Sequence, residues 1–226
     1  SLVGSEMCIR DRYNLTQEQL SHTLMPVGEY TKDQIRKIAE DIGLQVAHKA
    51  DSQEICFIPD NDYAGFIERE AENVPGPGNF VTADGTVIGR HEGITHYTIG
   101  QRKGLNLAMG HPVFVTEIRP ETNEVVIGEA GDVFTDTLVC NKLNWMAIDG
   151  LHGKPMEVSA KIRYSHKGAP CVIEEIGEDL VQCHFSEPVR AVTPGQAVVF
   201  YDGDYVVGGG TIIRCCLLYT SPSPRD

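Results

Sequence analysis

The chain has 226 residues, of which 41% are hydrophobic, and its 32 acidic and 19 basic residues give a formal net charge of -13. This composition is typical of a globular protein with one large or two small domains, and no apolar stretch is long enough to span a bilayer. The negative balance excludes nucleic-acid binding by bulk electrostatics, so an RNA partner would have to meet a local basic patch.

The seven cysteines are irregularly spaced and include no Cys-x-x-Cys pair. The sequence also lacks a His-x-x-x-His pair and a Gly-x-x-x-x-Gly-Lys loop, so we expect neither a metal site nor a P-loop. No secretory signal is present at the N terminus. We therefore expect a cytoplasmic protein with reduced thiols.

One short DNA element, read on opposite strands, can encode both ends of the chain. When residues 216–226 are reverse-translated, the complementary strand read in a shifted frame encodes "LVGSEMCIRD", the sequence of residues 2–11. We interpret residues 1–12 and 215–226 as tails derived from a sequencing adaptor. The authentic protein is then expected to run from about Tyr13 to Arg214 and to be cut at both ends.

Helices come first along the chain. Residues 16–24 form one candidate helix, and residues 31–42 form a better supported one, with a capping-box pattern at its start and Gly43 as its stop. Residues 60–74 predict a third helix, which the Pro-Gly cluster at 75–78 ends. This cluster is the expected domain boundary.

After the cluster the pattern changes to strands. Asp84-Gly85 and the turn at 120–123 each lie between β-prone runs and predict two hairpins. Further strand-like runs follow at residues 156–166, 171–185 and 197–210. Regularly spaced antiparallel strands with polar turns favour a small barrel or sandwich for the C-terminal portion.

Cys56 lies in a short apolar run that directly follows four polar residues at 51–54. A free cysteine is most often a buried, inert thiol that behaves as a small hydrophobe. The four preceding polar residues also fit a thiol at the edge of a helix or strand, where it would be exposed enough to ionise and react. The residues alone leave both interpretations open.

Two basic stretches could meet an RNA despite the acidic total. One is the turn Gly-Gln-Arg-Lys-Gly at 100–104, and the other is residues 160–168, where cations share a strand face beside an aromatic. Cations interleaved with aromatics suit phosphate contact and base stacking, although a solvated turn and an ordinary exposed strand are equally reasonable. The residues concerned are Arg102 and Lys103 in the first stretch, and Lys161, Arg163 and Tyr164 in the second.

Three stretches in order resemble the tRNA-specific 2-thiouridylase family: "GEYTKDQIRKIAEDIGLQVAHKADSQEICFIPDNDYAGFI", "GPGNFVTADGTVIGRHEGITHYTIGQRKGL" and "VTPGQAVVFYDGDYVVGGGTI". The likeness extends over nearly the whole segment between the tails. It implies an α+β fragment, with a helical remnant of an α/β ATP-pyrophosphatase domain, a small β-rich central domain and a C-terminal antiparallel β-barrel that contacts tRNA. The expected bounds of these three parts are 13–73, 74–134 and 135–214.

The resemblance also implies roles for individual residues. The family motif Asp-Ser-x-x-Ile-Cys-Phe-Ile carries the cysteine that receives sulfur as a persulfide, and it falls on Cys56. That sulfur comes from a sulfur-relay donor protein and goes to C2 of the wobble uridine, which ATP, with Mg²⁺, activates as an adenylate. A partner cysteine then releases the sulfur and leaves a disulfide. Arg163, Tyr164 and Gln196 match tRNA contacts, and we add Lys161, Arg102 and Lys103 as neighbouring contacts.

The family's nucleotide loop, Ser-Gly-Gly-x-Asp-Ser, is absent from this sequence, and the partner cysteine is expected ahead of residue 13. We therefore expect this chain to be inactive by itself, with tRNA and the sulfur donor as partners and no DNA, membrane or structural metal. Two alternatives stay open. The chain could be a tRNA-binding module without chemistry of its own, or a cytosolic β-rich interaction protein with a buried structural cysteine.

Overall fold

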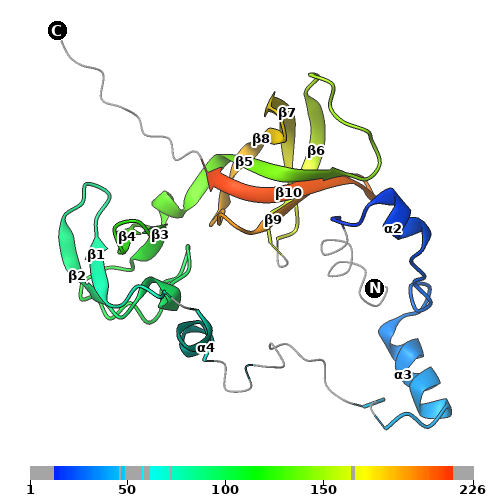
Figure 1. Cartoon of the computed structure of the whole chain (residues 1–226), viewed down its shortest axis with the longest axis horizontal. Helices are drawn as coiled ribbons and strands as arrows, with labels where there is room; N and C mark the ends of the chain where they lie inside the picture. Colours follow the sequence, from blue (N-terminus) through cyan, green and yellow to red (C-terminus); the bar gives the residue numbers. More distant parts are fainter. Residues whose placement is uncertain are drawn as a thin grey trace. The chain divides into compact units, whose positions relative to one another are not determined.

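The computed structural model describes residues 13–45, 47–48, 58, 62–71, 73–163 and 166–215. Its contacts divide the chain into two compact units, which we describe separately (Figure 1). The barrel unit contains the described residues up to 48 together with 136–187 and 194–215. The central unit contains the described residues from 58 to 135 together with 188–193.

Three short helices form where the sequence predicts them: α2 (Gln17–Ser21), α3 (Lys32–Asp41) and α4 (Tyr63–Glu70). Both α2 and α3 begin with a capping box. In α3, Thr31 accepts a hydrogen bond from the backbone N–H of Gln34, whose side chain accepts one from the N–H of Thr31 at 2.7 Å. The chain leaves α3 through Gly43, whose φ of 72° favours glycine. Local capping therefore defines these helices, none of which contains a buried residue.

The central unit is built on a four-stranded sheet in the order β2-β1-β4-β3. The strands are β1 (Gly78–Val81), β2 (Val87–His91), β3 (Phe114–Arg119) and β4 (Glu124–Gly128), with single 3₁₀ turns at η1 (Ile94–His96) and η2 (Gly131–Val133). The two predicted hairpins are β1–β2 and β3–β4, and the parallel pairing of β1 with β4 joins them. Phe80, Val115 and Val125 lie at the centre of the apolar core beneath this sheet.

The barrel unit closes six strands into a barrel in the order β10-β5-β8-β7-β6-β9 (Figure 1). Its strands are β5 (Phe134–Trp145), β6 (Met156–Lys161), β7 (Ala169–Gly177), β8 (Leu180–Arg190), β9 (Ala197–Asp202) and β10 (Tyr205–Cys215). A barrel was one of the two predicted architectures. Sequence reasoning missed β5, because Leu138, Val139 and Cys140 are buried in succession and break the two-residue alternation that identifies a strand.

The glycines of β10 are required by close packing on the barrel. A Cβ atom at Gly209 would lie 2.5 Å from the carbonyl oxygen of Val198 and 2.6 Å from the ring of Tyr13. The Tyr13 segment is fixed at this place, because the side-chain amide of Asn144 donates to the carbonyl oxygens of Tyr13 and Leu15. Glycine therefore lets the Tyr13 segment lie against the barrel strands.

We expect Gly209→Ala to lower the free energy of unfolding of the barrel unit by about 1–3 kcal/mol, because a methyl group must displace backbone or the Tyr13 ring. Urea denaturation followed by fluorescence measures this loss. Gly177→Ala in β7 of the same unit is the matched control, since the nearest atom to a Cβ placed there is the flexible end of the Leu180 side chain at 3.2 Å. Equal stability of the two variants would show that the contact at Gly209 relaxes without cost.

Candidate functional site

Two of the predicted site residues, Cys56 and Tyr164, lie outside the described residues, so their roles stay predictions. The remaining five fall into two groups. Lys161, Arg163 and Gln196 belong to the barrel unit, whereas Arg102 and Lys103 belong to the central unit. The two groups are therefore described as separate surfaces.

The end of β6 and the start of β9 form one end of the barrel. Along β6 alternate residues point into the barrel, which leaves Lys161 and Arg163 partly exposed on the outer face, as the two-residue period predicts. The two strands pair antiparallel with Lys161 opposite Val199. Because of this direction, residues after Lys161 and residues before Val199 lie at the same end. The fold thus brings Arg163 and Gln196 to one end of the barrel.

Arg163 and His166 are joined by a hydrogen bond, in which the N–H of His166 donates to the carbonyl oxygen of Arg163 at 3.1 Å. The Nε of Arg163 and the Nδ1 of His166 are buried and have no hydrogen-bond partner in the described part of the chain. Burial, and then the positive charge of Arg163, lower the pKa of His166. Unpaired buried polar atoms are costly, so a polar or anionic ligand that supplied the missing partner would stabilise this end of the barrel.

Tyr201 is a neighbour of this site that sequence reasoning missed. The Nζ of Lys161 lies 5.4 Å from the centroid of the Tyr201 ring, a distance at which the ammonium is attracted to the ring face. Tyr201 is 40 residues further along the chain and reaches Lys161 only through the pairing of β6 with β9. No local pattern in the sequence could have joined the two.

The second basic surface is the turn at 100–104, and its backbone is fixed rather than flexible. The N–H of Gly100 donates to the carbonyl oxygen of Val115 at 2.7 Å, and the N–H of Val115 donates to that of Gln101 at 2.9 Å. The Gln101 side chain accepts from the N–H of Thr98 at 2.9 Å and donates to the carbonyl oxygen of Lys103 at 3.0 Å. Its amide therefore holds the turn together, and only Arg102 and Lys103 are presented outward.

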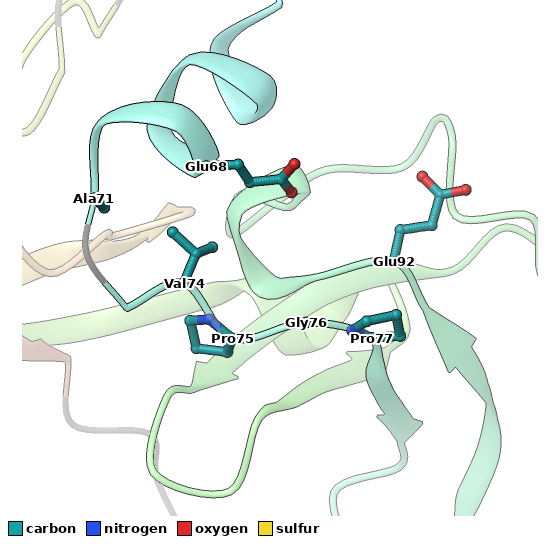
Figure 2. A pocket seen from close by; sticks show the side chains of 7 residues that line it. All are labelled: Glu68, Ala71, Val74, Pro75, Gly76, Pro77 and Glu92. Atoms are coloured by element: carbon teal, nitrogen blue, oxygen red, sulfur yellow. The ribbon is translucent and has the colours of Figure 1, made fainter.

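The central unit also contains a hollow of about 430 Å³. Figure 2 shows the carboxylates of Glu68 and Glu92 near the segment Pro75-Gly76-Pro77 that lines it, and Glu68 is also hydrogen-bonded to His96 at 3.0 Å. Two carboxylates repel phosphate groups, and none of the predicted site residues lines this hollow. It is therefore a poor place for RNA.

Three family models match successive parts of the chain. They are the "tRNA methyl transferase HUP domain" over residues 12–60, the "tRNA methyl transferase PRC-barrel domain" over 64–129 and the "Aminomethyltransferase beta-barrel domain" over 135–212. The chain is also 63% identical over 202 residues to the tRNA-specific 2-thiouridylase MnmA of Lachnoclostridium phytofermentans, an alignment that covers 89% of this chain and 56% of that protein. The chain belongs to the tRNA-specific 2-thiouridylase family.

Other members of the 2-thiouridylase family are similar over the same region. The proteins of that name from Clostridium perfringens and Carboxydothermus hydrogenoformans are 58% and 55% identical, over 88% of this chain and 55% and 54% of their own lengths. The chain thus spans about half the length of the curated relatives it matches. The three matched models occur in the predicted order of a catalytic-domain remnant, which the HUP model matches, a central β-rich part and a C-terminal barrel.

The part of the 2-thiouridylase HUP region that the structure describes shows no feature that identifies a nucleotide site. Backbone N–H groups at a helix N terminus are one means by which proteins bind phosphate. Here Thr16 and Thr31 already accept hydrogen bonds from the first turns of α2 and α3 through their capping boxes. We therefore assign no described residue to ATP. In the same described part, no helix has the length and apolarity to cross a membrane, and no cluster of three or more metal-ligating side chains occurs.

Three thiols of the barrel unit are unsuited to sulfur chemistry. Cys140, Cys171 and Cys183 are at most 3% exposed and belong to the barrel core. Burial raises the pKa of Cys140 to about 12. A hydrogen bond with Cys171, followed by burial, raises the pKa of Cys183 as well. Because a sulfur carrier must be reached by its donor and by its substrate, none of these three buried thiols can replace Cys56 in that role.

His91 makes the stability of the central unit dependent on pH. Its Nε2 donates to the carbonyl oxygen of Asn123 at 3.1 Å, and its Nδ1 is buried and unpartnered, so a second proton would find no acceptor. Burial lowers the pKa of His91 from its ordinary value of 6.5. Below that value the unfolded chain binds a proton that the folded chain does not. We expect the free energy of unfolding to fall by up to about 1.4 kcal/mol per pH unit as the pH drops below about 6.5.

Urea titrations between neutral and mildly acidic pH, followed by a probe in the central unit, test this dependence. His91→Gln keeps an N–H donor for Asn123 and does not titrate, so its stability should vary less over the same range. If both proteins lose stability in parallel, His91 is not the titrating group.

Proposed function

We propose that the intact protein transfers sulfur to C2 of the wobble uridine of tRNA, with Cys56 as the sulfur carrier. The observation that carries this proposal is the 63% identity, over 202 residues, to a protein named as a tRNA-specific 2-thiouridylase. The motif around Cys56 lies within the family resemblance, and the basic barrel end offers a place for the RNA. Cytoplasmic location, ATP with Mg²⁺ and a sulfur-relay donor belong to the same proposal.

Cys56 is suited to the carrier role by the chemistry of sulfur. A thiolate attacks the donor's persulfide, a new S–S bond forms at Cys56, and the donor's own thiol leaves. The terminal sulfur of Cys56 is then the nucleophile at C2, where a C–S bond forms and the activated oxygen departs. Attack on the remaining S–S bond by a second cysteine releases the sulfur to the product and leaves a disulfide. Covalent carriage avoids the loss of free sulfide.

The barrel end would hold the tRNA through Arg163, Tyr164 and Gln196, with Lys161 beside them. Local cations can contact phosphates while the rest of the surface stays acidic. Arg102 and Lys103 would contact the RNA from the central unit. The division into parts at 13–73, 74–134 and 135–214 is included in this proposal.

By itself, this chain would act as a tRNA-binding module without chemistry. Two observations favour this second function for the fragment. No described residue of its HUP region is assigned to a nucleotide, and Cys140 and Cys183 are buried with raised pKa values. The chain would then bind tRNA without thiolating it, even when ATP and a sulfur donor are supplied.

Alkylation of the native chain tests the role of Cys56. With iodoacetamide near neutral pH, we expect Cys56 to react at least about 100-fold faster than Cys140, because an accessible thiolate reacts and a buried thiol does not. Peptide mass spectrometry at several times gives both rates, and the unfolded chain provides the reference in which both thiols react alike. A Cys56 as slow as Cys140 in the native chain would favour the buried structural cysteine and would contradict the proposal.

A further inference from the structure

The segment that ends β8 supplies a third cation beside the turn at 100–104. Residues 188–193 belong to the central unit, and the N–H of Ala191 donates to the carbonyl oxygen of Val133 at 2.7 Å. Ala191 is buried and lies close to Gly100. A Cβ atom placed on Gly100 would lie 2.8 Å from the Cβ of Ala191. The segment therefore rests directly against the turn, and Gly100 has to be a glycine.

Arg190 is held in a defined position by this packing. Its Nη2 donates to the carbonyl oxygen of Gly100 at 3.3 Å, and its Cζ lies 5.2 Å from the centroid of the Phe114 ring. Stacking on a ring restricts the guanidinium plane before any ligand arrives. A guanidinium group has five N–H donors, and the carbonyl oxygen of Gly100 accepts from one of them. Most of the N–H donors of Arg190 are therefore left for another acceptor.

The charges at this place are not neutralised. In the described part of the chain, no carboxylate forms an ion pair with Arg102, Lys103 or Arg190, whereas Arg119 on β3 lies 3.0 Å from Glu117 and 3.8 Å from Glu124. Three positive charges thus share one rigid surface in a protein whose net charge is -13. A structural role for Arg190 needs only the bond to Gly100 and does not explain why the turn also presents two exposed cations.

We infer that Arg102, Lys103 and Arg190 form a binding site for the phosphodiester backbone of RNA on the central unit, with Arg190 as a direct phosphate contact. This inference rests on the proposed tRNA function. The planar guanidinium of Arg190, flanked by the charges of Arg102 and Lys103, matches phosphate oxygens in charge and geometry. The fixed backbone of the turn at 100–104 reduces the entropy lost on binding. The site reads no base and positions the RNA independently of the barrel end.

The experiment measures binding of a tRNA transcript with an unmodified wobble uridine to this chain over a series of salt concentrations. Each lost phosphate contact lowers the slope of log K against log salt by about 0.7–0.9. We expect Arg102→Ala with Lys103→Ala to lower the slope by about 1.5 and the affinity about tenfold or more at low salt. Arg90→Ala, which removes one exposed cation from β2 of the same unit, is the control and should change the slope little.

Adding Arg190→Gln to the double variant separates contact from positioning. Glutamine retains an N–H donor for Gly100 and removes the charge, so folding, checked by thermal denaturation, is preserved. A further fall in slope of about 0.7–0.9 is the expected result for a direct phosphate contact. No further fall would overturn the assignment of Arg190, because a residue that only positions the turn has no effect once Arg102 and Lys103 are gone.

The other outcomes separate this inference from the proposed function. If the double variant binds with an unchanged slope while Arg163→Ala lowers it, the site on the central unit is refuted and the tRNA function stands. If the unaltered chain binds the transcript no better than an acidic control protein does, both are refuted.

Discussion

Replacing Cys56 by serine is expected to abolish sulfur transfer to tRNA in a full-length enzyme. A hydroxyl does not form the S–S bond of a persulfide and does not ionise near neutral pH, so both steps of the relay are lost. We expect the yield of 2-thiouridine to fall by on the order of a thousandfold or more, with tRNA binding retained. This is the largest effect we predict.

The measurement needs the parts of the enzyme that lie outside this chain. Residues 13–214 can replace the matching segment of the Lachnoclostridium phytofermentans relative, which is 63% identical over 202 residues. Mass spectrometry of digested tRNA nucleosides then quantifies thiouridine. It also distinguishes sulfur from a methyl group, which matters because the names of two matched family models refer to methyl transfer.

Cys171→Ala in the same chimera is the matched control. It removes a thiol that is 3% exposed inside the barrel and that the mechanism does not use. We expect it to cost some stability while thiolation remains within a few fold of the unaltered enzyme. Retained thiolation in Cys56→Ser would refute the carrier role directly.

The second largest expected effect is a loss of tRNA affinity in Arg163→Ala. Removing a charged hydrogen-bond donor costs about 1.5–3 kcal/mol, which corresponds to at least about a tenfold loss in affinity at low salt. The slope of log K against log salt should also fall by about 0.7–0.9, because one phosphate contact and its released counterion are lost. Fluorescence anisotropy with a labelled tRNA transcript measures both quantities in this chain.

Two further variants make the Arg163 result specific. Arg163→Lys keeps the charge and loses the buried Nε donor, so the slope should stay while part of the affinity is lost. Lys154→Ala removes an exposed cation from another loop of the barrel unit and should change neither quantity appreciably. If Lys154→Ala weakens binding as much as Arg163→Ala does, the effect comes from total charge and the barrel-end site is refuted.

Local features of the sequence predicted much of the fold. The capping box at Thr31 and the stop at Gly43 give the beginning and end of α3 correctly, because both signals act within one helical turn. The hairpin turns at Asp84-Gly85 and at 120–123 were also found, since turn chemistry is local. β5 was missed, because its successive buried residues reflect contacts made inside a closed barrel.

The candidate site shows the same division between local and long-range information. The sequence by itself determined which residue types could act: the cysteine in its family motif, the cations around 102 and 163, and the acidic balance that confines RNA to local patches. Only the tertiary structure placed Gln196 at the barrel end of Arg163, Tyr201 beside Lys161, and Arg190 against Gly100. Strand pairing and packing between distant segments decide these neighbours, and no local periodicity encodes which distant strand a residue will meet.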